Sequence, residues 1–311
     1  MKKIIISTAS FGRYDKAPLQ MLKKNKFKIA LNPYGRQLSE KEIKGLLVDA
    51  DGLIAGTEPL TQNVVKSAKN LKVISRCGAG IDNVDLEAVK KRGIQLYRTP
   101  DSHALAVAEL TLGLMLDSLR YISYLNKKIS KGGWEKKMGR LLSGKTIGII
   151  GMGAVGKRLA VLLKPFSCKI LARDPAPDGK FAKKNKFDYV SLKQLLNKSD
   201  IVTLHLPLTK KTNRFFNAGF FRDMKNGSVF INTSRGKLVD EDALFRALKT
   251  GKLSYAALDV FSEEPYKGKL RKLENITLTC HIGAYAKEAR ELMEKEAVEN
   301  LLKGLERRGC K

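Results

Sequence analysis

The chain has 311 residues, of which 43% are hydrophobic and 29% are charged. This composition is typical of a folded globular protein, and the length suffices for two domains, so fibrous and disordered classes are excluded. The formal net charge of +28 favours anionic ligands. Because the lysines are spread along the whole chain, we interpret them as a solvated surface and expect small anions rather than nucleic acid as partners.

Neither a membrane segment nor a metal site is expected. The basic start of the chain reaches Gly12 without the apolar core of a signal peptide. The most apolar longer stretch, residues 104–119, is too short to span a bilayer comfortably and carries Glu109 and Asp117. The cysteines form no CxxC pair, which argues against zinc and against a disulfide framework, and predicts a cytoplasmic location; they are Cys77, Cys168, Cys280 and Cys310.

In chain order, the first third alternates short β-rich runs with helical segments. One such helix is predicted at residues 39–48, where Ser39 and Glu42 have the spacing of a capping box. Alternation of this kind predicts a parallel sheet covered on both faces, as in a flavodoxin-like substrate domain. The five predicted strands are residues 3–7, 28–31, 52–56, 72–76 and 94–98.

A long helical pattern over residues 102–130 leads into a second series of strands. These begin 21 to 32 residues apart, which is the repeat of a βα unit, and six of them complete a Rossmann fold. They are residues 146–150, 169–172, 201–206, 228–232, 255–260 and 276–279.

A final helix at residues 287–306 has no strand of its own, so we expect it to return to the first domain. The predicted fold is therefore α/β, with two doubly wound parallel sheets. Residues 1–99 and 286–311 would form the substrate domain, and the Rossmann domain of residues 100–285 would be inserted into it.

The first strand of that Rossmann domain runs into a GxGxxG sequence followed by an apolar helix. A lone GxGxxG is a weak signal, but strand and helix on its two sides make it a dinucleotide-binding pattern rather than a structural turn. The helix N-terminus would face the diphosphate with its free N–H groups. The predicted contacts are Gly151, Gly153, Ala154, Val155 and Gly156.

Asp174 stands at the end of the next strand, eighteen residues after Gly156. A carboxylate here accepts the adenosine ribose hydroxyls and repels a 2′-phosphate, which predicts NAD as the cofactor. The neighbouring Arg173 leaves tolerance of NADP open.

Polar residues follow the later strands, at the edge where parallel sheets bind ligands. Singly, each is most simply a surface or structural residue, but together they occupy four successive strand ends. Glu264 lies behind Asp259, and the segments that we predict to contact the nicotinamide end of the cofactor are His205, Leu206 and Pro207; Thr233, Ser234 and Arg235; Asp259; and His281, Gly283 and Ala284.

Three of these side chains suit hydride transfer between a nicotinamide and a 2-oxo or 2-hydroxy acid. Arg235 would bind the carboxylate and polarise the carbonyl, because its planar fork pairs with carboxylates. His281 would donate or accept the proton, and Glu264 would orient the imidazole. We therefore predict Arg235, Glu264 and His281 as the catalytic residues.

The sequence over residues 52–297 resembles the D-isomer-specific 2-hydroxyacid dehydrogenases, most closely their D-3-phosphoglycerate dehydrogenase branch. The resemblance lies in residues 75–83, 233–236, 257–265 and 281–284. It implies that Asp259 contacts the nicotinamide amide and that the protein is a homodimer. It also implies a loop that binds the substrate carboxylate through amides near residues 78–80, with Arg76, Cys77, Gly78, Ala79 and Gly80 as substrate-binding residues.

Departures from the family pattern leave the substrate open. Glu58 stands near a position where a phosphate-binding enzyme would offer a basic residue, and His103, Cys280 and Tyr285 also differ from common family residues. D-3-phosphoglycerate is the first substrate hypothesis, followed by an unphosphorylated 2-oxo acid. An NAD-sensing regulator or corepressor is the alternative from another class, and formate dehydrogenase activity ranks below it.

Overall fold

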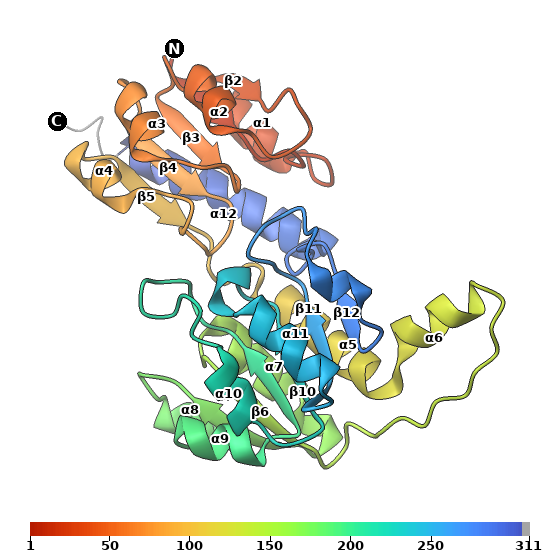
Figure 1. The fold of residues 1–311 in the computed structure, drawn as a ribbon. Helices are drawn as coiled ribbons and strands as arrows, with labels where there is room; N and C mark the ends of the chain where they lie inside the picture. Colours follow the sequence, from red (N-terminus) through yellow and green to blue (C-terminus); the bar gives the residue numbers. More distant parts are fainter. Residues whose placement is uncertain (307–311) are drawn as a thin grey trace. The chain divides into compact units, whose positions relative to one another are not determined.

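The computed structural model describes residues 1–306, so Cys310 lies outside the described part. The chain divides into two compact units. Unit 1 comprises Met1–His103 and the chain from Tyr285 onward, and unit 2 comprises Ala104–Ala284. The sequence places these divisions at residues 99 and 285. Each unit contains one parallel α/β sheet (Figure 1), which confirms the predicted fold class.

Unit 1 has five parallel strands in the order β2-β1-β3-β4-β5, which is the flavodoxin-like order. They are β1 (Lys3–Ile6), β2 (Lys28–Leu31), β3 (Gly52–Ala55), β4 (Val73–Arg76) and β5 (Gln95–Arg98). One face of the sheet is covered by α2 (Glu40–Leu46), α3 (Gln62–Ser67) and α4 (Leu86–Lys91). The capping box is present, because Ser39 accepts the Glu42 N–H and the Glu42 carboxylate accepts the Ser39 N–H.

The last helix, α12 (Lys287–Glu306), packs against β3, β4, β5 and α1 (Ala17–Lys24) within unit 1. Its buried side, which includes Met293, Ala297 and Leu301, faces the sheet. The chain therefore returns to its first unit, as the lack of a strand beside this helix predicts. No helix within residues 1–306 is long and apolar enough to cross a membrane.

Unit 2 has seven parallel strands in the order β12-β11-β10-β9-β6-β7-β8. They are β6 (Thr146–Ile150), β7 (Lys169–Arg173), β8 (Asp188–Tyr189), β9 (Ile201–Leu204), β10 (Ser228–Asn232), β11 (Leu253–Leu258) and β12 (Ile276–Leu278). The sequence predicts six strands and misses β8. This edge strand has two residues, too few to show an apolar run, and it lies in the longest interval between predicted strands.

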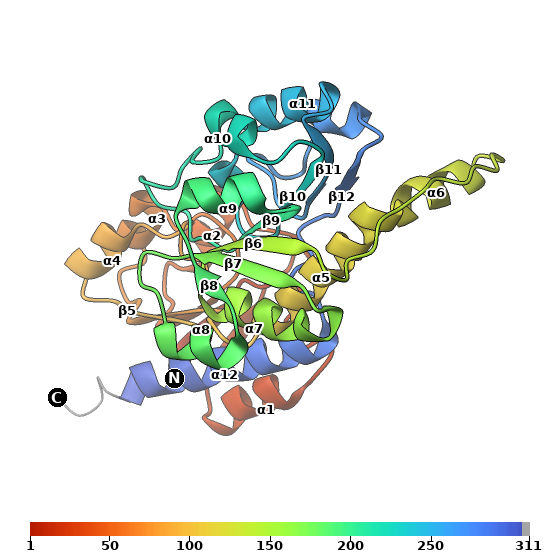
Figure 2. The same ribbon diagram turned by 90° about the horizontal axis from the view of Figure 1, so that it is seen from below.

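Helices cover both faces of the unit 2 sheet (Figure 2). The core of one face contains residues of α9 (Leu192–Lys198), α10 (Ala218–Asp223) and α11 (Glu241–Lys249). The core of the other contains residues of α5 (Ala104–Arg120), α7 (Ala154–Leu162) and α8 (Gly179–Asn185). The carboxyl ends of the strands are left open for loops, which is where parallel sheets place their ligands.

The single helix predicted over residues 102–130 is wrong, because α5 ends at Arg120 and α6 (Ile122–Ile129) starts separately. Tyr121 between them has a left-handed backbone with φ of 58°. The buried Asp117 carboxylate accepts the Ser123 N–H at 2.6 Å and so holds the redirected chain. Figures 1 and 2 show α6 and the segment after it projecting from the unit 2 sheet.

Candidate active site

The glycine loop after β6 brings three parts of unit 2 into close contact. A Cβ at Gly151 would lie 2.3 Å from the His205 carbonyl oxygen, and one at Gly156 would lie 2.2 Å from the Gly151 carbonyl oxygen. Gly151 also has a φ of 99°, in the region that favours glycine. At Gly153 a Cβ would meet nothing within 4 Å. The loop therefore has no room for a side chain at Gly151 or Gly156, whereas the space beside Gly153 is open.

The open glycine stands at the N-terminus of α7, which begins at Ala154 with Gly153 as its N-cap. Within residues 1–306, the N–H groups of Ala154 and Val155 donate to no other group. Free N–H groups and the positive end of the helix dipole form an anion site. The cradle fits a diphosphate.

Asp174 follows β7 beside this cradle. One of its carboxylate oxygens accepts the Met152 N–H at 2.7 Å, and the other accepts the Ala176 N–H at 2.8 Å. Arg173 also binds the glycine loop, since its carbonyl oxygen accepts the Gly151 N–H at 2.9 Å. The carboxylate is thus fixed next to the glycine loop by backbone donors.

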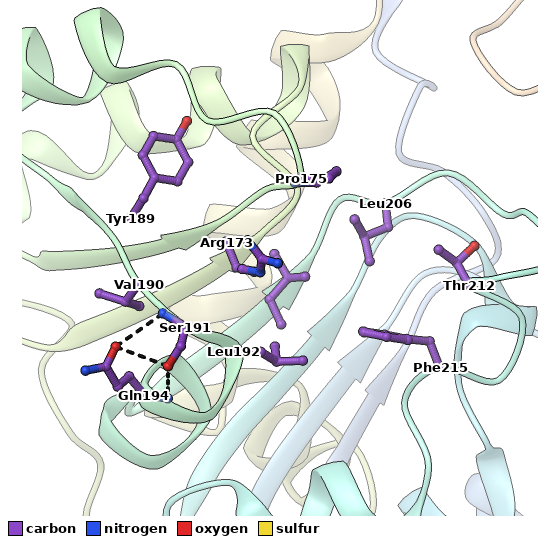
Figure 3. Close-up of a pocket in the computed structure, with 11 residues that line it drawn as sticks. Arg173, Pro175, Tyr189, Val190, Ser191, Leu192, Gln194, Leu206, Thr212 and Phe215 are labelled. Atoms are coloured by element: carbon purple, nitrogen blue, oxygen red, sulfur yellow. Dashed lines mark hydrogen bonds between the residues drawn. The ribbon is translucent and has the colours of Figure 1, made fainter.

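A hollow of about 690 Å³ opens beside Arg173, at the ends of β6, β7 and β8 (Figure 3). Its apolar walls suit a flat aromatic ring. Leu206 is the one lining residue that the sequence also assigns to the cofactor. The other lining residues include Tyr189, which belongs to the missed strand β8, Leu192, which follows it, and Phe215.

The carboxyl ends of β11 and β12 bring two predicted catalytic side chains together. The Nδ1 of His281 lies 2.8 Å from Oε2 of Glu264. The two side chains are 40% and 37% exposed, respectively. Both can therefore be reached from solvent while they bond to each other.

Burial opposes ionisation of Glu264, but the hydrogen bond and charge of His281 outweigh it. The Phe261 N–H and the charge of Arg235 act in the same direction, and the pKa of Glu264 lies below its ordinary value of 4.5. Because the carboxylate is ionised at neutral pH, Nδ1 of His281 carries the hydrogen that it donates. The Nε2 atom is then the one that exchanges protons.

Asp259 holds the loop that carries His281. It is 1% exposed, and its carboxylate accepts the Thr279 hydroxyl at 2.6 Å and the N–H groups of Ile282 and Gly283 at 2.8 Å each. Its carbonyl oxygen accepts the His281 N–H at 2.8 Å. These bonds stabilise a left-handed backbone at His281, where φ is 58°. The orientation of the imidazole therefore depends on Asp259.

Arg235 follows β10 in an extended conformation, and its guanidinium donates to the Ser234 carbonyl oxygen at 2.7 Å. A Cβ at the next residue, Gly236, would lie 1.8 Å from the carbonyl carbon of Phe261. The segment that carries Arg235 is thus packed directly on the segment that leads to Glu264. All three predicted catalytic residues gather at one edge of unit 2.

His205, by contrast, is not a proton-transfer group in this arrangement. Burial lowers the pKa of its imidazole to about 3, so the ring is neutral at physiological pH. Nε2 lies 3.2 Å from the Thr203 hydroxyl. The carbonyl oxygen of His205 is the group that Gly151 approaches. His205 therefore contributes to the glycine loop through its backbone.

In unit 1, two of the predicted N–H donors in the loop after β4 already donate to groups of the protein. The Cys77 N–H donates to Ala55, and the Gly78 N–H donates to the Thr99 hydroxyl at 2.8 Å. The N–H groups of Ala79 and Gly80 donate to nothing within the described residues. The amides open to a ligand are therefore those of the second half of the predicted loop.

The chain is similar to known proteins over most of its length. Residues 112–283 match the model of the D-isomer specific 2-hydroxyacid dehydrogenase, NAD binding domain. The chain is 37% identical over 299 residues to a hydroxypyruvate reductase of Thermotoga maritima, covering 94% of this chain and 95% of that protein. It is 38% identical to a D-3-phosphoglycerate dehydrogenase of Methanocaldococcus jannaschii, covering 86% of this chain and 52% of that protein.

Among solved structures, the TT0316 protein from Thermus thermophilus superposes with a TM-score of 0.89 at 34% identity. The alignment covers 98% of this chain and 97% of that one. The matched domain is one that binds NAD, and the glycine cradle, Asp174 and the apolar hollow fit this dinucleotide, so NAD is the cofactor. The chain belongs to the D-isomer-specific 2-hydroxyacid dehydrogenase family.

Proposed function

We propose that the protein interconverts a D-2-hydroxy acid and its 2-oxo acid, with Arg235, Glu264 and His281 as catalytic residues. The observation that carries this proposal is the 2.8 Å bond between His281 and an ionised Glu264 at the strand ends of a dinucleotide-binding sheet. Family membership supplies the reaction class, and the geometry supplies a proton donor with a fixed orientation.

When bound, NAD supplies the hydride donor or acceptor. In reduction, Nε2 of His281 gives a proton to the carbonyl oxygen of the substrate, and in oxidation it removes the hydroxyl proton. Glu264 fixes the orientation of the ring through its bond to Nδ1. Arg235 binds the substrate carboxylate and polarises the neighbouring carbonyl.

We propose the cofactor contacts from the same geometry. The amides of Ala154 and Val155 hold the diphosphate, and Asp174 accepts the adenosine ribose hydroxyls. The hollow beside Arg173 receives the adenine ring. We assign the nicotinamide end to the strand-end residues around the catalytic trio, which are His205, Pro207, Thr233, Ser234, Asp259, Gly283 and Ala284.

In unit 1, we assign the carboxylate of the substrate to the amides of Ala79 and Gly80. The acid itself is either D-3-phosphoglycerate or an unphosphorylated relative, because curated relatives of both kinds are similar to this chain. The hydroxypyruvate reductase matches over nearly its whole length, whereas the chain spans about half of the phosphoglycerate dehydrogenase.

We further propose a cytoplasmic homodimer. The projecting segment after α6 carries Trp134 at 86%, Met138 at 93% and Leu141 at 70% exposure. Apolar side chains gathered on one segment are costly to leave in water and are typical of a protein interface. Sedimentation velocity should give a dimer, and Trp134→Ser with Met138→Ser should shift it toward monomer.

The function is tested by following NADH oxidation with a panel of 2-oxo acids. The panel comprises 3-phosphohydroxypyruvate, hydroxypyruvate, glyoxylate, pyruvate and 2-oxoglutarate. We expect turnover with at least one of them. NADH binding without oxidation of any member would contradict the proposal and would favour an NAD-sensing regulator.

A further inference from the structure

An ion pair joins the helix after the glycine loop to the segment that follows Asp174. Nζ of Lys157, on α7, lies 2.6 Å from Oδ2 of Asp178. The Lys157 N–H donates to the carbonyl oxygen of Gly153, so this lysine stands one turn of helix beyond the cradle. Asp178 follows Asp174 by four residues and is the N-cap of α8, where its Oδ1 accepts the Phe181 N–H at 3.0 Å. The pair therefore connects the helix that starts at the cradle with the loop that starts at Asp174.

The same pair is bonded to a wall of the apolar hollow. The Asp178 N–H donates to the hydroxyl of Tyr189 at 3.1 Å, and Tyr189 lines the hollow (Figure 3). On the other side, Nζ of Lys157 lies 5.0 Å from the centre of the Phe181 ring. These contacts hold the two charged side chains beside the hollow that we assign to the adenine ring.

Lys157 and Asp178 are both ionised at neutral pH. The hydrogen bond from Lys157 is the main cause that lowers the pKa of Asp178, and the same bond raises the pKa of Lys157. The charge of Asp174 also raises the pKa of Lys157, so the ammonium is within electrostatic reach of the carboxylate that we assign to the ribose. The two side chains of the pair are 36% and 39% exposed, so a ligand can reach them.

A 2′-phosphate on the adenosine ribose distinguishes NADP from NAD and would lie next to Asp174. Phosphate binding needs cations that are free to approach it. Arg173 is exposed here and donates to the Asp174 carbonyl oxygen at 3.2 Å. The exposed Lys180 and Lys183 of α8 add positive charge, but such a field attracts the diphosphate of both cofactors. Selection therefore depends on the charged groups that act on Asp174 itself, and Lys157 is one of them.

We propose that the Lys157–Asp178 pair is a second determinant of cofactor choice, in which Asp178 holds Lys157 away from a 2′-phosphate and reinforces the selection of NAD over NADP. This inference rests on the proposed contact of Asp174 with the adenosine ribose. Without the charge of Asp178, the released ammonium would bind the phosphate or offset the negative charge of Asp174. Either outcome favours NADPH relative to NADH.

The experiment measures the dissociation constants of NADH and NADPH by fluorescence titration of the full chain, with no 2-oxo acid present. Asp178→Asn removes the charge but keeps a side chain that caps helices well, so we expect the fold to be retained. The ratio of the NADPH to the NADH dissociation constant should fall by about tenfold, while NADH binding itself changes by less than about twofold. A ratio within about twofold of the wild-type value would overturn the proposal.

A double variant identifies the cation that is released. Lys157→Met combined with Asp178→Asn should restore the wild-type ratio, because the unpaired ammonium is gone. Asp85→Asn is the matched control, since Asp85 caps α4 in unit 1 by accepting the Ala88 N–H at 2.8 Å, and it should leave the ratio unchanged. A ratio that stays low in the double variant, or that falls equally in Asp85→Asn, would overturn the proposal.

Melting temperatures verify that the variants fold. If Asp178→Asn does not fold, Lys157→Met decides, because an unpaired Asp178 should raise the ratio and an unchanged ratio would overturn the proposal. The titrations need no turnover. NADH that binds but is oxidised by no 2-oxo acid would therefore contradict the proposed function, and the ratio of dissociation constants would still decide this inference.

Discussion

The strand-end edges of the two units use charged side chains in opposite ways. In unit 2, His281 and Glu264 bond to each other and remain about two-fifths exposed. In unit 1, Arg290 and Glu294 also bond to each other, yet they are 5% and 2% exposed. The first pair can act on a ligand, whereas the second can only hold the protein together. Two bonded pairs of charged groups thus differ in what they can do because one is open to solvent and the other is buried.

The strongest test of the accessible pair is His281→Ala. We expect kcat to fall by about a thousandfold, because the proton donor is lost, while NADH still binds in a fluorescence titration. Cys280→Ser changes the neighbouring exposed residue and serves as the control. Its kcat should stay within about twofold of the wild-type value. Full activity in the His281 variant would remove the basis of the mechanism.

The buried pair should instead govern stability. Glu294→Gln leaves Arg290 as an uncompensated buried charge, and the free energy of unfolding in urea should fall by about 3–5 kcal/mol. Glu291→Gln is the matched control on the same helix, since Glu291 faces Lys287 at 4.0 Å near the surface. Its effect should stay below about 1 kcal/mol. Equal losses of the free energy of unfolding in the two variants would show that the buried pair does not govern stability.

Glu264→Gln should lower kcat/KM for reduction by roughly 10- to 100-fold, a smaller effect than loss of the imidazole. The pKa of Glu264 in the wild type lies below 4.5, so this carboxylate does not titrate between pH 5 and 9. The stabilisation from its bond to His281 is present at neutral pH and is lost as the pH falls through that lowered pKa. In the variant, the loss should appear in kcat rather than in NADH binding, because the carboxylate that fixes the imidazole through Nδ1 is gone. Wild-type kcat in the variant would show that Glu264 does not act on His281.

The smallest effect is expected at the cofactor. Asp174→Ala should weaken NADH binding by about tenfold and improve the relative use of NADPH, because Asp174 no longer opposes a 2′-phosphate beside Arg173. Asp188→Asn, an exposed carboxylate on β8, serves as the control. Unchanged discrimination between the two cofactors would mean that Asp174 only supports the glycine loop.

Sequence periodicity predicted both sheets, because parallel strands buried on both faces leave apolar runs that are easy to recognise. It missed β8, whose two residues leave no such run, and the break at Tyr121, which depends on Asp117 bonding to the chain beyond it. The strand-end rule also brought Glu264 and His281 together correctly. It could not tell that Arg76 is buried, with 7% of its surface exposed, because residue type alone does not report burial.

The contact between Gly56 and Glu58 limits how position 56 of this chain can change. A Cβ at that position would begin 2.8 Å from Oε2 of Glu58, so a side chain there requires the carboxyl group to move. Glu58 is 1% exposed, and its Oε1 accepts the Ser7 hydroxyl at 2.6 Å and the Gly56 N–H at 3.1 Å, so that movement would cost two buried hydrogen bonds. A larger residue at position 56 is therefore expected to be tolerated only after Glu58 itself has been replaced.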